Sequence, residues 1–416
     1  MAPSPRPYLR LVWSDPESAA TGYVVVDRLV TGIATGGLRM RPGCTLAEVE
    51  DLAREMSLKT ACYRLPVGGA KGGIDYPADA DDADAVRERF VRAVRPLLDS
   101  IWTTAGDLGT PQSRLDAVFE RLGLGPSSLR AGLLRSPDRA TTERQVQRLF
   151  TLLDDGLVMP SLIGGYGVAE AALAGLDALG IPAGSARAVV QGFGAMGGSS
   201  ALYLHRAGAR VVGISDAGGL LVNTERGLDV PHLLGNRTHD GLIDRAALRA
   251  DDEQRARDDW LDLPCEVVVP AATSYSVTED NCARLQTRLV VEAANVPLTQ
   301  TAEASLLGRG VPVIPDFVAN AGAAAWAWWA MFGLVTDADD SRAMVTRHVR
   351  PLVAHLMEEW LTAGVAPRKT AGTVAEHNLA EMSEQFGDVD ERVPLYTAGA
   401  TSARHAMTDD TMGRHW

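Results

Sequence analysis

A single lysine lies within a run of small residues from Pro66 to Gly73. Four glycines and one alanine share this run with Lys71. Glycine allows tight backbone paths and lets a ligand come close to the main chain. Burial favours the neutral form of an amine, and a neutral amine can act as a general base or activate a water molecule. The run is equally typical of a flexible glycine loop with a solvated lysine, so both interpretations stay open.

For two other charged side chains in the first third of the sequence, a functional role and a structural role are both possible. Asp107 follows a short strand predicted over 101–104 and is flanked by glycines. An aspartate there is either a turn residue or a carboxylate presented into a cleft. Lys59 lies near the end of a helix predicted to begin at Thr45, at the edge of its apolar stripe. A purely structural role is also possible, in which the aliphatic part of the Lys59 side chain packs on the core and its ammonium group stays in water.

A second group of residues lies where predicted strands and helices begin to alternate. A strand over 187–191 runs into Gly192–Gly197, which has the spacing G-x-G-x-x-G, and a helix follows to about residue 207. The next strand, over 210–215, ends in Asp216. A glycine fingerprint between a strand and a helix, with an acidic residue ending the next strand, is the context that dinucleotide binding requires.

The glycines in this fingerprint would let backbone amides and a helix N-terminus approach a pyrophosphate. Asp216 would accept hydrogen bonds from the adenosine ribose hydroxyls. The alternative is a tight turn that binds no ligand. The predicted cofactor contacts of the fingerprint are Gly192, Phe193, Gly194, Ala195, Met196 and Gly197.

Three more buried strands are predicted over 265–269, 288–291 and 311–314, each short and rich in valine or isoleucine. In an open parallel sheet the carboxyl ends of the strands line the ligand crevice. The residues expected to meet a cofactor near these ends are Ala271, Asn295 and Asn320.

The bulk composition limits the classes of function. A length of 416 residues predicts two or three domains. The formal net charge of -13 argues against a nucleic-acid or anionic-membrane partner. The four cysteines are scattered and form no C-x-x-C pair, and no His/Cys cluster is present, so we expect no metal site and a reducing compartment. With neither a secretory signal nor a long apolar stretch, we predict a cytoplasmic protein without a membrane span.

Two regions are harder to interpret. Residues 112–160 are rich in arginine, leucine and serine, and they read as a surface insertion or a hinge region. Trp326, Trp328 and Trp329 lie on a predicted helix near residue 325, where core or interface packing is the expected role.

Seven blocks of the sequence, in order and spread over roughly residues 20–330, resemble the Glu/Leu/Phe/Val amino-acid dehydrogenase family. The blocks are Gly36–Met40, Met56–Lys59, Pro66–Gly73, Gly106–Thr110, the fingerprint at Gly192–Gly197, Glu292–Asn295 and Pro315–Gly322. The resemblance implies an α/β fold with an N-terminal α/β substrate domain, a C-terminal Rossmann-like dinucleotide-binding domain and a cleft between them. It places the substrate and oligomerisation domain at 1–155, with about 345–416 packing back, and the NAD-binding domain at 156–344.

The same resemblance implies roles for single residues. Lys59 corresponds to the lysine that pairs with the substrate α-carboxylate, assisted by the backbone at Gly36 and Gly37. Lys71 corresponds to the catalytic lysine, and Asp107 to the aspartate that relays protons to and from the substrate amine. The implied reaction is the reversible oxidative deamination of an L-α-amino acid to a 2-oxo acid and ammonia, by a homo-oligomer.

The cofactor expected from these features is NAD, with NADP less favoured. Asp216 would repel a 2′-phosphate, and the residues directly after it, Ala217–Gly219, offer no cation that could hold one.

Two positions of the side-chain pocket depart from the glutamate dehydrogenases of the family. The lysine that grips a side-chain carboxylate corresponds to Thr35, and a serine that assists it corresponds to Ala327. A buried carboxylate without a partner would cost several kcal/mol. We therefore expect an apolar or aromatic amino acid, as for the leucine, phenylalanine and valine enzymes, in place of glutamate.

Other departures leave alternative functions open. The family threonine that touches the nicotinamide amide is replaced by Gly164, a common asparagine by Ser274, and a glycine by Ala323. The segment between Asp107 and Gly164 is also longer than usual. The alternatives are a member with altered catalysis that acts on an unusual amine or imine, or a non-enzymatic NAD-binding regulatory protein.

Overall fold

The computed structural model describes residues 6–154, 156–238 and 241–386. The chain forms two compact units. Among the described residues, the first comprises 6–147, Ala327–Leu334 and 374–386, and the second comprises Arg148–Trp326 and Val335–Thr373. These units differ in their limits from the predicted substrate and NAD-binding domains, whose assignment remains a prediction. The helices α5 (Arg139–Phe150), α11 (Gly322–Met331) and α13 (Pro367–Phe386) each contain residues of both units.

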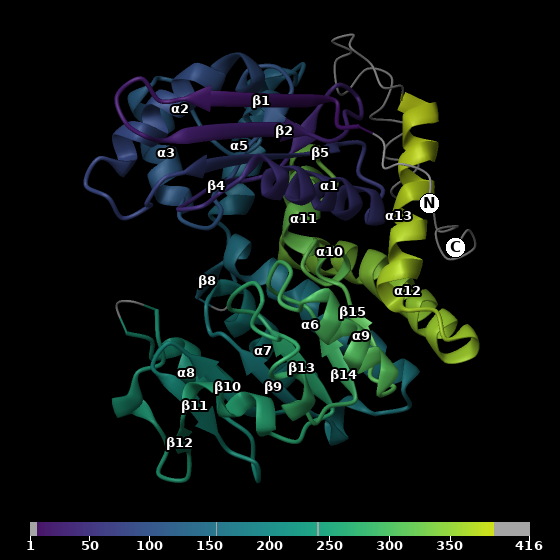
Figure 1. Ribbon diagram of the computed structural model, residues 1–416. Helices are drawn as coiled ribbons and strands as arrows, with labels where there is room; N and C mark the ends of the chain where they lie inside the picture. Colours follow the sequence, from purple (N-terminus) through teal and green to yellow (C-terminus); the bar gives the residue numbers. More distant parts are fainter. Residues whose placement is uncertain (1–5, 155, 239–240, 387–416) are drawn as a thin grey trace. The chain divides into compact units, whose positions relative to one another are not determined.

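The first unit is built on a six-stranded mixed sheet with helices packed against it (Figure 1). The strand order is β1-β2-β5-β3-β6, and β4 pairs with β5 as well. The pairs β1–β2 and β2–β5 are antiparallel, whereas β3 and β4 run parallel to β5. The other elements of this unit are β1 (Leu9–Ser14), β2 (Thr21–Val26), β3 (Ala34–Thr35), β4 (Leu38–Arg41), α1 (Leu46–Cys62), β5 (Gly68–Asp75), α2 (Ala83–Leu98), β6 (Trp102–Thr103), α3 (Gln112–Arg121) and α4 (Arg130–Leu134).

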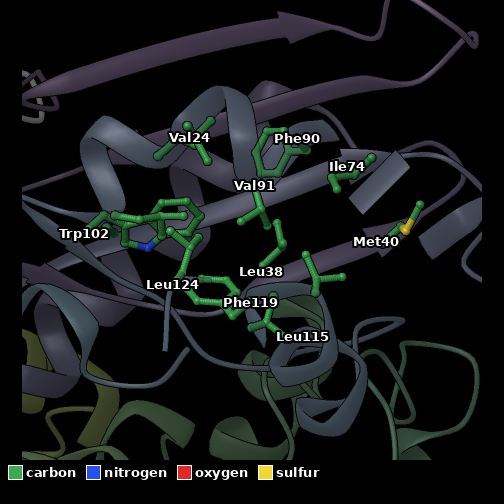
Figure 2. Packing of buried hydrophobic residues seen from close by; sticks show 14 of the residues in the cluster. Val24, Leu38, Met40, Ile74, Phe90, Val91, Trp102, Leu115, Phe119 and Leu124 are labelled. Atoms are coloured by element: carbon green, nitrogen blue, oxygen red, sulfur yellow. The ribbon is translucent and has the colours of Figure 1, made fainter. Parts of the chain in front are cut away.

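The core of the first unit lies between the sheet and helices α2 and α3 (Figure 2). Val86, Phe90 and Val94 recur every fourth residue of α2, so that they share one buried face of the helix. The Phe90 ring packs on the strand backbone, where a Cβ atom on Gly22 would lie 2.4 Å from it. The predicted cap at the start of α1 is confirmed, because the Thr45 side chain accepts a hydrogen bond from the Glu48 amide.

The run around Lys71 is a central strand and not a flexible loop. It forms β5, which pairs on both sides and is buried along nearly its whole length. Glycines serve close packing here, since a Cβ atom on Gly69 would lie 2.1 Å from the Ser57 amide nitrogen of α1. The interpretation as a mobile loop with a solvated lysine is therefore wrong, because Lys71 is 4% exposed.

The second unit contains a seven-stranded sheet in the order β12-β11-β10-β9-β13-β14-β15. The strands β10, β9, β13, β14 and β15 are parallel to one another. The strands β11 and β12 extend the sheet beyond β10, and each pairs antiparallel with its neighbour. The strands predicted after residue 186 are confirmed, with ends shifted by up to two residues. The elements of this unit are β7 (Leu153–Asp154), β8 (Leu157–Val158), α6 (Met159–Ala178), β9 (Arg187–Gln191), α7 (Ala195–Arg206), β10 (Arg210–Asp216), β11 (Gly219–Val222), α8 (Val230–Gly235), β12 (Glu253–Arg255), β13 (Val267–Pro270), β14 (Leu289–Val291), α9 (Gln300–Gly308), β15 (Val313–Ile314), α10 (Asp316–Ala319) and α12 (Ala338–Ala363).

The architecture is thus the predicted α/β fold, with a mixed-sheet unit followed by a mostly parallel, doubly wound unit. The segment 112–160 folds into α3, α4, α5 and the β7–β8 hairpin. The three tryptophans of α11 are buried, as expected for packing residues. Among the described residues, no helix is both long and apolar enough to span a bilayer.

Candidate active site

Lys71 and Asp107 form a buried ion pair in the first unit. The Lys71 Nζ atom lies 2.7 Å from Asp107 Oδ2, and the side chains are 5% and 15% exposed. A third charged group, the guanidinium of Arg39, donates from Nε to the same oxygen at 3.2 Å. Two cations therefore converge on one carboxylate.

Three neighbouring strands bring these residues together. Lys71 lies in the middle of β5, and Arg39 lies on β4, which pairs in parallel with β5. Asp107 occupies a turn after β6 that is closed by two backbone hydrogen bonds between Asp107 and Thr110. Glu48 on α1 accepts from Arg39 Nη1 at 2.6 Å and so fixes the arginine from its other side. Each charged group is held by a regular element or a closed turn, which limits its movement.

The Gly36–Gly37 pair lets the chain pass directly beside this cluster. A Cβ atom on Gly36 would lie 1.6 Å from the carbonyl oxygen of Ala70, the neighbour of Lys71. On Gly37 it would lie 3.1 Å from the Asp107 Cβ atom. No other residue type fits at Gly36, and the close approach leaves the local backbone next to both catalytic candidates.

Lys59 belongs to the last turn of α1 and is 7% exposed. Its helix packs on the strand that carries Lys71, since the Gly69 amide donates to Ser57 Oγ at 3.2 Å. Ser57 precedes Lys59 by two residues, and Gly69 precedes Lys71 by two. The hydrogen bond between α1 and β5 therefore lies two residues before each lysine.

The use of lysine in this sequence is selective. Lys59, Lys71 and Lys369 are its three lysines, so that 37 of the 40 basic residues are arginines. Arginine stays protonated in proteins, whereas a lysine amine can release its proton. Two of the three lysines are buried in the first unit. A sequence that otherwise prefers arginine therefore keeps a titratable amine at these two places.

The electrostatics of Asp107 follow from its partners. Burial works against its charged form, but the attraction of Lys71 and Arg39 outweighs burial and holds the pKa of this carboxyl well below its usual range. Asp107 is therefore ionised in this arrangement, and it is ready to accept a proton once a partner cation moves or releases one.

The two side-chain pocket positions lie in the first unit and carry no charge. Thr35 ends β3, where its hydroxyl donates to the Thr103 carbonyl oxygen at 3.5 Å. Ala327 lies on α11 and is partly buried. Their joint action on a substrate side chain remains a prediction.

The fingerprint of the second unit has the backbone geometry that a pyrophosphate needs. Gly192 has φ = 103°, a conformation that favours glycine, and Gly197 packs so closely that a Cβ atom would lie 2.1 Å from the Gly192 carbonyl oxygen. Gly194 is exposed, a Cβ atom on it would meet no other atom within 4 Å, and no side chain caps the start of α7. The amides of this helix start are available to an anion, so the residues fit a dinucleotide.

The other predicted cofactor residues gather at the same edge of the sheet. Ala271 follows β13 and lies beside the fingerprint, 3.2 Å from the position of a Cβ atom on Gly197. Asn320 donates from Nδ2 to Asn295 Oδ1 at 3.1 Å, and Ser274 Oγ donates to the Asn295 carbonyl oxygen at 2.7 Å. The loops after β13, β14 and β15 are thereby joined into one surface.

Two departures from the family pattern face one another in the second unit. A Cβ atom on Gly164 would lie 3.0 Å from Met196 Cε and 3.3 Å from Ala323 Cβ. Met196 belongs to the fingerprint helix. The methyl group of Ala323 occupies part of the space that a larger residue at 164 would need, so the two changes compensate each other in volume.

Three arginines near the predicted sites were not foreseen as site residues. Arg39 lies in the motif around Gly36–Gly37, and its charge next to that motif was the available signal. Arg237 reaches the fingerprint and Arg245 reaches Asp216 from a segment with no recognisable motif, so nothing in the sequence pointed to them. Residues 217–219 offer no cation, as expected, but Arg245 from further along the chain binds Asp216.

Comparison with family models gives two matches. Residues 11–122 match the model described as Glu/Leu/Phe/Val dehydrogenase, dimerisation domain, and residues 160–387 match the model described as Glutamate/Leucine/Phenylalanine/Valine dehydrogenase.

The chain is also similar to individual proteins. It is 31% identical to the catabolic NAD-specific glutamate dehydrogenase of Bacillus subtilis over 73% of this chain and 68% of that protein. It is 32% identical to a glutamate dehydrogenase of Thermotoga maritima over 73% of this chain and 70% of that protein. A similar solved structure is the hetero-hexameric glutamate dehydrogenase of Thermus thermophilus in its Leu-bound form, with 27% identity, a TM-score of 0.68, and coverage of 91% of this chain and 89% of that one.

Proposed function

Because the chain belongs to the Glutamate/Leucine/Phenylalanine/Valine dehydrogenase family, we propose that it catalyses the reversible NAD-dependent oxidative deamination of an L-α-amino acid. The chain is an amino-acid dehydrogenase, an oxidoreductase that acts on a CH–NH2 group. The observation that carries the mechanism is the buried pair of Lys71 and Asp107, 2.7 Å apart, on a sheet whose neighbouring helix presents Lys59.

In the proposed reaction the α-carbon of the substrate loses a hydride, and a water molecule then replaces the nitrogen. NAD supplies the hydride acceptor. The Lys59 ammonium binds the α-carboxylate, and backbone groups at Gly36 and Gly37 complete this contact. A single point charge suffices for that role, so lysine is adequate there.

Lys71 and Asp107 divide the proton transfers between them. Lys71 takes a proton from the water that adds to the iminium carbon, forming the new C–O bond. Asp107 carries a proton to the nitrogen, and it then accepts the proton of the new hydroxyl group as the C=O bond forms and the C–N bond breaks to release ammonia. Their separation of 2.7 Å is one hydrogen bond, so a proton can pass between them without an intervening group.

NAD is the cofactor that we propose, since the Bacillus subtilis relative is NAD-specific by name. The second unit supports this proposal with an uncapped helix start after a glycine turn and with the linked loops of Asn295 and Asn320. The dimerisation-domain match at residues 11–122 and the hetero-hexameric relative support an oligomer, and we propose that its subunits are copies of this chain.

For the substrate side chain, two observations point in different directions. The named relatives act on glutamate, whereas Thr35 and Ala327 offer no charge to a second carboxylate. We propose an apolar or aromatic side chain, because burying an unpaired carboxylate costs several kcal/mol.

The decisive assay measures NADH formation with each proteinogenic L-amino acid, and its reversal with the matching 2-oxo acids and ammonia. We expect turnover with leucine, valine, phenylalanine or tryptophan to exceed that with glutamate by about tenfold or more, since several kcal/mol separate the two classes. The variant Thr35→Lys should raise kcat/KM for glutamate relative to leucine. A wild-type enzyme that prefers glutamate would overturn the substrate proposal and leave the dehydrogenase proposal intact.

A further inference from the structure

A short hairpin in the second unit reaches the dinucleotide fingerprint from outside the sheet. Its two sides are joined by the bridge between Arg237 and Ile243 and by the bond from the Thr238 amide to the Leu242 carbonyl oxygen, 2.8 Å long. The hairpin brings two arginines, Arg237 and Arg245, against residues that a cofactor would touch.

Arg237 fixes the hairpin to the glycine turn. Its Nη2 atom donates to the carbonyl oxygens of Phe193 and Gly194, and its guanidinium lies 4.6 Å from the centre of the Phe193 ring. The fit is tight, because a Cβ atom on Gly198 would lie 2.1 Å from Arg237 Nη2. The position of Arg245 relative to the fingerprint is therefore set by packing.

Arg245 occupies the carboxylate that was expected to bind ribose. Asp216 Oδ1 accepts from Arg245 Nη2 at 2.6 Å and from the Gly218 amide at 2.9 Å. Asp216 Oδ2 accepts from Arg245 Nη1 at 3.2 Å and from the Ile243 amide at 2.8 Å. An ionised carboxylate has about four acceptor sites, so these donors use its whole capacity.

Of the two charged groups at this end of β10, the arginine is the one that solvent reaches. The Asp216 side chain is 3% exposed, whereas that of Arg245 is 24% exposed. In the common pattern an unpaired acid at this position binds the ribose 2′-hydroxyl of NAD and repels a 2′-phosphate, while a nearby arginine accommodates that phosphate. Here the acid Asp216 is buried in an ion pair with Arg245, and Arg245 is the more exposed group.

We propose that Arg245 determines cofactor choice and lets the site accept NADP as well as NAD, an inference that rests on the proposed nicotinamide-dependent activity. A 2′-phosphate binds Arg245 by replacing its neutral partners, the carbonyl oxygens of Gly219 at 3.1 Å and Ile243 at 3.2 Å. Charge-assisted bonds to a phosphate are stronger than bonds to neutral carbonyls, so this exchange is favourable. The pairing with Asp216 persists during the exchange and keeps the guanidinium in place.

The test is calorimetric titration of the full-length protein with NAD and with NADP, in the wild type and in Arg245→Gln. We expect the wild type to bind both cofactors and Arg245→Gln to lose about tenfold or more in NADP affinity, with NAD affinity changed less than about threefold. The matched control is Arg284→Gln, which removes a surface arginine paired with Asp262 at 2.6 Å in the same unit, and it should change neither affinity.

Undetectable NADP binding by the wild type, or equal effects of Arg245→Gln on both cofactors, would overturn the inference. If Arg245→Gln does not fold, Asp216→Asn provides the test, because it removes the counter-ion of Arg245. This variant should raise the ratio of NADP affinity to NAD affinity severalfold. An unchanged ratio would overturn the inference. NAD binding and amino-acid turnover in the wild type separate the outcomes. If both are present while the NADP predictions fail, only the role of Arg245 is wrong, and if neither cofactor binds, the proposed function itself is wrong.

Discussion

Lysine and arginine have different tasks in this chain. The ion pairs on the surfaces of both units are made by arginines, such as Arg10 with Glu50 and Arg284 with Asp262. Two of the three lysines, Lys59 and Lys71, are buried in the first unit. An arginine in either place would supply charge but could not release a proton, so the lysine at position 71 supports the proton transfer that we propose for it.

The buried cluster around Asp107 makes a prediction about acid stability. The folded-state pKa of Asp107 lies below the ordinary value of 3.8 because Lys71 and Arg39 outweigh its burial. A carboxyl with a lowered pKa contributes stability above its unfolded-state pKa, and this contribution is lost as the pH falls towards the folded-state value. We expect the free energy of unfolding of the wild type to fall more steeply than that of Asp107→Asn between about pH 5 and pH 2.

Chemical denaturation at a series of pH values measures this difference. Asp79→Asn serves as the control, because it removes an exposed aspartate from the same unit and should leave the wild-type slope unchanged. Parallel curves for the wild type and Asp107→Asn would show that the cluster does not hold Asp107 in its charged form.

At the scale of single elements, glycine has two distinct uses in the fingerprint. Gly197 is needed for packing, because a Cβ atom there would meet the Gly192 carbonyl oxygen at 2.1 Å. A Cβ atom on Gly194 would have no neighbour within 4 Å, and Gly194 lies at the uncapped start of α7. We expect Gly197→Ala to lower the free energy of unfolding by about 1–3 kcal/mol, as overpacking does.

Gly194→Ala should unfold like the wild type and yet bind NAD more weakly, because the added methyl group lies where the pyrophosphate approaches the backbone. Urea unfolding and cofactor titration of both variants separate the two uses. Equal loss of stability in the two variants would show that the distinction is wrong.

The sequence predicts structure well where the signals for an element lie close together along the chain. The strand–glycine–helix pattern at 187–207 predicted β9 and α7 because each signal lies within a few residues of the next. The sequence could not decide whether the run around Lys71 is a flexible loop, since its glycines make room for α1, and only the tertiary structure reveals that approach. Arg245 escaped notice for the same reason, being 29 residues from Asp216 in the chain.

At the scale of the whole molecule, each compact unit has its own charged anchor. In the second unit Arg368 joins three buried or nearly buried carboxylates, with distances of 2.5 Å to Glu292, 2.7 Å to Glu303 and 3.4 Å to Asp316. These groups underlie the loops that carry Asn295 and Asn320, because the Asp316 amide donates to Glu292 Oε2. Burial raises the pKa of Glu292 to about 8, a measure of how strongly this site disfavours charge.

Removing this anchor should unfold the second unit more easily. Arg368→Met leaves three carboxylates without their cation, and we expect a loss of about 3 kcal/mol or more in the free energy of unfolding. Arg284→Gln, which breaks an exposed pair in the same unit, should cost less than about 1 kcal/mol. Thermal and urea unfolding of both variants measure the contrast, and similar small effects would show that the cluster is not an anchor.

We propose that the first unit binds the substrate through Lys59 and Lys71 and that the second unit binds NAD at the fingerprint. On that proposal neither unit suffices alone, and each has its own family match, at residues 11–122 and 160–387. The sequence predicted both sets of residues through motif order, whereas the side-chain specificity rests on Thr35 and Ala327, positions that no local pattern marks.

The central claim is that the Lys71 amine transfers a proton during amino-acid oxidation. Steady-state NADH formation from the best amino-acid substrate tests it in the wild type, in Lys71→Arg and in Lys369→Arg, the last removing an exposed lysine as a control. Lys71→Arg keeps the charge beside Asp107 but cannot release a proton, so kcat should fall by about 100-fold or more while NAD affinity stays the same. Lys369→Arg should match the wild type. Undiminished turnover in Lys71→Arg would contradict the account.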